Sequence, residues 1–164
     1  MANSGMVTDL EAMARIFEYG AWFHKRSSGN DDEEAFVDDM GYILGGIDPW
    51  GRARGGGQVV DFGDSGFKAQ YRDGTNQVQH FVGAMAAGRT GGRAVATIVM
   101  DVRELVTEGG NTADMALNQI GGAIGAGLDG IGVGLEDIGQ VVREEVGDPT
   151  QVPRLFPGQR VTPR

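Results

Sequence analysis

The chain contains no cysteine among its 164 residues. This absence excludes disulfides, thiolate metal sites and cysteine nucleophiles. Any metal would therefore be bound by histidine, carboxylate, amide or backbone oxygen groups. Histidine is scarce as well, since His24 and His80 are the only two in the chain.

Positive charge is also in short supply. There are 14 basic and 23 acidic residues, which gives a formal net charge of −9. A negatively charged domain repels phosphate backbones, so we expect no nucleic-acid partner. The arginines gather within residues 52–54, 89–93 and 154–164 but do not alternate with aromatic residues, and we interpret them as solvated charge.

Long apolar runs are missing too. The longest candidate, residues 115–128, includes Asn118 and Gln119 and is shorter than the roughly 20 apolar residues that span a bilayer. No basic leader precedes an apolar run in the first twenty residues, as a secretory signal would require. We therefore expect no transmembrane segment and a soluble protein, cytoplasmic by default unless it is exported without a cleaved signal.

Helical signals dominate what is present. Residues 8–27 place Leu10, Met13, Phe17 and Ala21 on one face of a helix that Thr8 is suited to cap, with Glu11 three residues on as in a capping box. Acidic residues 31–34 suit the first turn of a second helix. Further helices are expected at 75–88, 92–107, 112–128 and 134–146, with Gly88 among the stop signals. The sequence predicts a mainly α fold, a single-domain helical bundle of five or six helices over residues 1–147.

Two segments do not fit this helical pattern. Residues 48–72 form a loop-rich insert, in which weak alternation after residue 58 indicates either a short hairpin turning at 63–66 or an irregular loop. Residues 148–164 hold three of the five prolines, and we expect them to form an extended or disordered tail.

Glycine is abundant, at 29 residues, and much of it falls inside expected helices. An interior helical glycine costs about 0.5–1 kcal/mol relative to alanine, a penalty that is tolerable where another backbone must come very close. Small residues four apart, at Gly121 and Gly125 and at Ala84 and Gly88, predict such close helix packing.

Polar side chains interrupt two of the apolar helices. Asn76 and His80 are four residues apart, so they share one face, and Asn76 or its neighbour at 75 is suited to cap the helix. Asp114 and Asn118 repeat this spacing, and their row continues to Gly121. A buried imidazole needs a hydrogen-bond partner or a metal, so these residues predict a polar centre inside the protein.

The middle helix bears on this centre through Glu104. Residues Val95, Ile98, Val99, Val102 and Val106 form an apolar row that we expect to face the core. Glu104 points roughly opposite that row. It is therefore expected to face solvent or a cleft, and in the former case it would not belong to the polar centre.

These residues resemble a known family. Asn76-Gln-Val-Gln-His80, Arg103-Glu104 and Asp114-Met-Ala-Leu-Asn118-Gln-Ile-Gly121 are similar in order and spacing to helical domains at the ends of bacterial polymorphic toxins. The resemblance covers roughly residues 70–130. Many relatives have histidine before the glutamate, where this chain has Arg103. Membership would imply a toxin-like domain, for which a partner or immunity protein is expected.

Two functional hypotheses follow. In the first, a toxin-like or effector-like hydrolase uses His80, Glu104 and Asp114 in catalysis, with or without a divalent metal, while Asn76, Asn118 and Arg103 position the substrate. In the second, the same polar groups form a buried network that fixes helix register. The chain is then a non-catalytic interaction module that binds through glycine-lined or aromatic surfaces.

Overall fold

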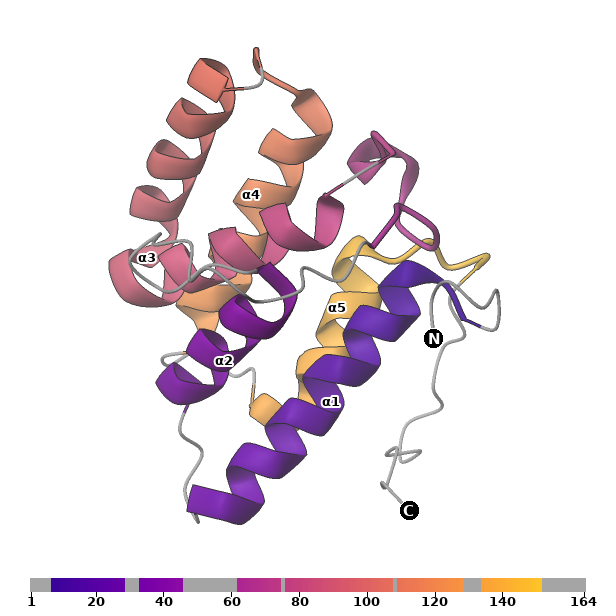
Figure 1. Ribbon diagram of the computed structural model, residues 1–164, viewed down its shortest axis with the longest axis vertical. Helices are drawn as coiled ribbons and strands as arrows, with labels where there is room; N and C mark the ends of the chain where they lie inside the picture. The colour runs from indigo at the N-terminus through magenta and orange to yellow at the C-terminus, as the bar shows by residue number, and fades with distance from the viewer. Residues whose placement is uncertain are drawn as a thin grey trace.

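The architecture is mainly α, as the sequence predicts (Figure 1). The computed structural model describes residues 7–28, 33–45, 62–74, 76–107, 109–128 and 134–151. Within these residues the helices are α1 (Asp9–Ser28), α2 (Glu33–Gly45), α3 (Gln77–Thr107), α4 (Thr112–Gly127) and α5 (Ile138–Val146). Two short 3-10 turns, Ala69–Tyr71 and Leu135–Asp137, complete the described elements.

The core forms where α1 meets α2, α3 and α5. The predicted apolar row of α1 is buried, and Phe17 lies at its centre with no exposed surface. Its ring centroid is 5.9 Å from that of Phe36 on α2 and 6.2 Å, edge-on, from that of Phe81 on α3. Such tilted and edge-on contacts are favourable for aromatic pairs, so one side chain links three helices.

The start of α1 is capped from two directions. The Thr8 hydroxyl accepts a hydrogen bond from the Glu11 backbone N–H at 3.2 Å, as the sequence predicts. The Ser65 hydroxyl, from the turn that precedes Phe67, accepts one from the Asp9 N–H at 2.9 Å. The Glu11 side chain does not complete a capping box; it bonds instead to Arg143 on α5.

Arg143 joins α1 to α5 through buried charge. Its guanidinium Nε donates to Glu11 Oε2 at 2.8 Å and its second terminal nitrogen to Oε1 at 3.1 Å, while its other side meets Glu18. Arg15 Nε also donates to Glu11 Oε1, at 2.7 Å. Two arginines thus balance two carboxylates, which is the condition under which buried charges are tolerated.

The longest helix, α3, bends sharply at Gly92. This residue has φ 78° and ψ 166°, values outside the helical region that glycine adopts without strain. The sequence predicts two helices here, and the break confirms the division. Its position differs: Gly88, the expected stop signal, lies inside the helix because it packs against the backbone of Gly122 on α4.

Glycines bring α3 and α4 into backbone contact. A Cβ atom at Gly121 would lie 2.5 Å from the carbonyl oxygen of Phe81, and one at Gly125 would overlap the carbonyl oxygen of Met85. A Cβ at Gly122 would lie 2.8 Å from that of Ala96, beyond the bend. The prediction of close packing is confirmed, and α4 lies against both halves of α3.

The loop-rich insert is described only from residue 62. Its turn at 64–67 is present, since the Phe67 N–H donates to the Asp64 carbonyl at 3.3 Å. The predicted hairpin is absent from residues 62–74, where Phe67 forms an isolated bridge with Gly147 and no strand. Residues 48–61 of the insert lie outside the described part.

The expected tail begins with a fixed turn. Arg72 contacts the carboxylate of Asp148 at 3.3 Å, and the Asp148 N–H donates to the Gly66 carbonyl at 2.7 Å. The Asp148 side chain also accepts from Thr150, and these hydrogen bonds lower the pKa of its carboxyl. Residues 152–164 lie outside the description.

None of the helices in the described ranges combines the length and the hydropathy that a bilayer crossing needs.

The Arg143 network predicts a pH-dependent stability. Burial alone would raise the pKa of Glu11, but the hydrogen bonds and charges of Arg143 and Arg15 outweigh it, so the pKa lies below the ordinary value of 4.5. We expect Glu11→Gln to lower the free energy of unfolding at pH 7 by about 2 kcal/mol, measured by urea denaturation. A carboxyl group whose pKa is lower in the folded than in the unfolded state stabilises the fold at pH values above its unfolded-state pKa. The difference between the two proteins should therefore shrink as the pH falls below 4.5.

Glu145→Gln is the control, because Glu145 is exposed on α5, the helix that carries Arg143. Equal effects of the two substitutions, or a difference between Glu11→Gln and the wild type that grows in acid, would contradict the account.

The backbone contact predicts opposite effects for two alanine substitutions in α4. Gly125→Ala should lower the free energy of unfolding by about 1–3 kcal/mol or more, because its methyl group has no room beside Met85. Gly127→Ala should be neutral or stabilise by up to about 1 kcal/mol, since a Cβ there meets no atom within 4 Å. Thermal or urea unfolding measures both, and a tolerated Gly125→Ala would refute the close approach.

Candidate functional site

The predicted polar residues meet at the start of α3 and the start of α4. Asn76 directly precedes α3 with a φ of 60°, and its carbonyl accepts the His80 backbone N–H at 3.1 Å. The α4 helix is capped by Asn111, whose side-chain oxygen accepts the Ala113 N–H at 3.0 Å. Both first turns are thereby fixed, and they place His80 of α3 opposite Asp114 and Asn118 of α4.

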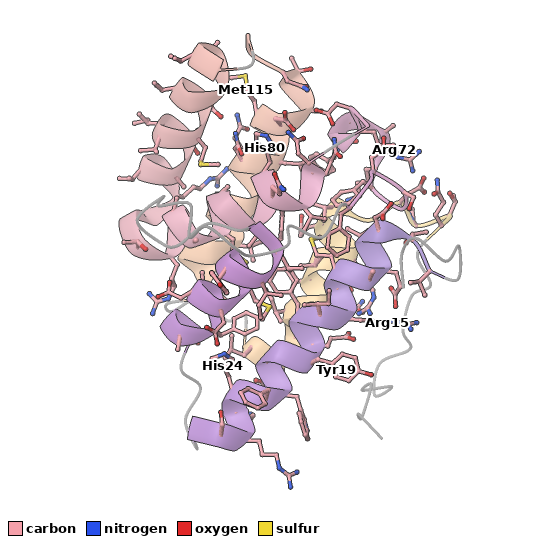
Figure 2. The ribbon with its side chains drawn as sticks, in the orientation of Figure 1. Arg15, Tyr19, His24, Arg72, His80 and Met115 are labelled. Atoms are coloured by element: carbon pink, nitrogen blue, oxygen red, sulfur yellow. The ribbon has the colours of Figure 1, made fainter. Side chains whose placement is uncertain are left out.

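His80 lies between the two polar residues of α4. Figure 2 labels it where α3 runs beside α4. Its Nε2 atom is 3.4 Å from Asp114 Oδ2, and its Nδ1 atom is 3.4 Å from Asn118 Oδ1. The side chain of His80 is 5% exposed and that of Asp114 is 0% exposed. The structure therefore brings His80, Asp114 and Asn118 together in the interior, as predicted.

Both ring nitrogens of His80 thus point to groups on α4. In a neutral imidazole one nitrogen donates and the other accepts. With Nε2–H directed at the carboxylate, Nδ1 needs a donor, and the Asn118 amide supplies one if its nitrogen rather than its oxygen faces the ring. That orientation would also satisfy Asn118 Nδ2, which is buried and otherwise makes no hydrogen bond within the described residues. His80 then hydrogen-bonds to Asn118 through Nδ1 and faces the Asp114 carboxylate through Nε2.

Gln77 is the residue that the sequence interpretation missed. Its side chain is fully buried, and neither amide atom has a hydrogen-bond partner in the described part of the chain. The same holds for Asn76 Oδ1, so its side chain makes no capping bond to the described residues. The spacing of three between Gln77 and His80 puts them on one face, which is the signal that could have identified it.

Asp73 and Asn111 form a second connection at this end of the helices. The Asn111 amide donates to the Asp73 carboxylate, which links the segment before α3 to the cap of α4. Neither residue was predicted to take part. Their contact depends on the turn at residues 72–74, which sequence periodicity does not define.

The two predicted residues of the middle helix are not placed at this centre. Arg103 and Glu104 belong to α3, but their side chains lie outside the described part of the structure. The direction of Glu104 was inferred from the expectation that the apolar row of this helix faces the core, and that expectation is wrong. The apolar row from Val95 to Val106 faces outward and is exposed, whereas Ala96 and Met100 on the other side are buried. The reason is the bend at Gly92, beyond which the distal half of α3 packs on α4 through its Ala96 side.

The other histidine has a packing role. His24 Nε2 lies 3.0 Å from Asp39 Oδ2, and the ring meets Phe36 edge-on with centroids 5.9 Å apart. It thereby connects α1 to α2, in addition to its place in the last turn of α1. Among the described residues no three His, Asp or Glu side chains gather as a metal site would require.

Comparison with family models, with curated proteins and with solved structures finds no match to this chain.

The geometry predicts that His80 and Asp114 depend on each other. His80→Leu should lower the free energy of unfolding by about 2–3 kcal/mol, because it leaves a fully buried carboxylate without its imidazole. His80→Leu combined with Asp114→Leu should cost less than the sum of the two single changes, with a coupling of about 1–2 kcal/mol in urea unfolding.

Gln119→Leu is the control in this series, since Gln119 is exposed on α4 directly after Asn118. It should couple to neither position. Additive effects of the His80 and Asp114 changes would show that the pair does not interact.

Proposed function

We propose that this chain is a non-catalytic helical interaction module whose binding surface is the distal half of α3. One observation carries the proposal: large aliphatic side chains stand exposed along one side of this helix. We call them the α3 outer face: Val95, Ile98, Val99, Val102, Leu105 and Val106, which are 48–80% exposed.

The outer face has the periodicity of a helix-pairing surface. Val95 and Val102 are seven residues apart, as are Ile98 and Leu105, and Val99 and Val106. They occupy positions a, d and e of two successive heptads, the pattern by which one helix packs along another. Isolated apolar residues on a protein surface need no explanation, but a contiguous row with this repeat supports a partner helix.

The described part of the fold does not use this face. Ala96, with no exposed surface, and Met100, with 7%, already provide the side of the helix that packs on α4. In Figure 1 the distal half of α3 runs beside α4 and away from α1 and α5. The outer face is therefore additional apolar surface, and burying it against a partner would remove it from water.

The polar centre supports the same conclusion. A general base needs a ring nitrogen directed at its substrate, whereas both nitrogens of His80 face Asp114 and Asn118 and the ring is almost fully buried. A buried network that fixes the register of α3 on α4 accounts for this arrangement. The toxin-like hydrolase, with His80, Glu104 and Asp114 in catalysis and Asn76, Asn118 and Arg103 at the substrate, stays a prediction.

Binding of an apolar dye tests the proposed surface. Dilute protein should bind anilinonaphthalene sulfonate, and Ile98→Asp together with Val102→Asp should remove most of that fluorescence while the circular dichroism stays unchanged. Thr97→Asp with Gln119→Asp is the matched control, since neither residue belongs to the outer face. Equal fluorescence from all three proteins would refute an exposed binding face.

A further inference from the structure

We infer that the occupant of the α3 outer face is a second copy of this chain, so that the protein pairs α3 against α3 as a homodimer. The inference rests on the proposed function and names its partner. It follows from the repeat, the area and the charge of the face.

The repeat allows the face to pair with itself. In a twofold dimer the same surface of both copies forms the contact, so a self-complementary row is required. The outer face offers β-branched residues at its a positions, Val95 and Val102, and larger aliphatic residues at its d positions, Ile98 and Leu105. Alternation of this kind lets each a or d side chain pack into the space between four side chains of an identical helix. Valine at the e positions widens the apolar row beyond a narrow seam.

The area is sufficient for a dimer at the lower end of the specific range. Six aliphatic side chains that are 48–80% exposed present on the order of 500 Å² per copy, so pairing would bury about 1,000 Å² in total. That value is the threshold for a specific contact. We therefore expect a dimer that dissociates on dilution rather than an obligate one.

The negative net charge of each copy predicts that added salt strengthens the pairing. The six positions carry no charged residue, while each copy carries a formal charge of −9. Two copies therefore attract through apolar burial and repel through their net charge. Screening by salt should tighten the dimer, whereas a contact with a basic partner would weaken as the salt concentration rises.

The full chain can be tested by analytical ultracentrifugation across a range of protein concentrations. We expect a monomer–dimer equilibrium whose dissociation constant falls several-fold between 50 mM and 500 mM sodium chloride. Val102→Asp, and separately Ile98→Asp, should raise the dissociation constant on the order of a hundredfold, because each dimer would bury two unpaired carboxylates. Thr97→Asp, outside the face, should change it by less than threefold.

Crosslinking then locates the contact. Because the chain has no cysteine, single substitutions give one thiol per copy. Oxidation should join copies of Val102→Cys or Val99→Cys and should not join copies of Thr97→Cys or Gln119→Cys. A disulfide requires Cα atoms of the two copies within about 7 Å. Crosslinks at all four a and d positions indicate parallel helices, and crosslinks only near the middle of the face indicate antiparallel ones. Both patterns support the dimer.

Three results would overturn the inference. A chain that stays monomeric while the Ile98 and Val102 changes still abolish dye binding has a different partner, and the proposed function stands. A monomer whose dye fluorescence does not respond to those changes does not offer the outer face to a partner, and both proposals fall. A dimer that tolerates Val102→Asp pairs through another surface.

Discussion

The contact on which the rest of this structure depends is the backbone approach of α3 and α4. Glycines at 121 and 125 of α4 lie directly against carbonyl groups of α3, where no side chain fits. This closeness brings His80 within reach of Asp114 and Asn118, and it lets α4 contact both halves of α3 across the bend at Gly92. The same contact leaves the other side of the distal half turned outward. The exposed aliphatic face of α3 is thus a consequence of how α3 and α4 pack.

Buried polar groups add specificity to an otherwise apolar assembly. The His80 centre aligns α3 on α4, while Arg143 with its carboxylates aligns α5 on α1. Glycine and alanine surfaces can slide past one another with little change in packing, whereas a buried imidazole between two partners has one favourable register. The polar residues that look catalytic in the sequence therefore have a sufficient structural role. The apolar row from Val95 to Val106 looks like core in the sequence but is exposed, and the proposal is that a partner covers it.

Local signals in the sequence were enough for much of the fold. Heptad-like spacing in α1, the Thr8 cap and the glycine spacing in α4 all gave correct predictions, because each depends on residues within one or two turns. Gly88 was wrongly predicted to end a helix, because its role is a close contact with Gly122, more than thirty positions away. The outward direction of Val95 to Val106 could not be inferred either. An apolar row indicates burial against something, but periodicity does not say whether that surface belongs to the same chain. Of the candidate site, the His80, Asp114 and Asn118 cluster was predicted. Gln77 was missed although it shares a helix face with His80, whereas the Asp73–Asn111 bond depends on tertiary geometry.

Methyl-group accessibility tests the orientation of α3 most directly. In dilute protein, a soluble paramagnetic agent should broaden the methyl resonances of Ile98, Val99 and Val102 strongly and leave those of Ala96 and Met100 sharp, because only the latter pack on α4. The opposite pattern, with Ala96 and Met100 broadened and the valines protected, would place the aliphatic row in the core and contradict the account.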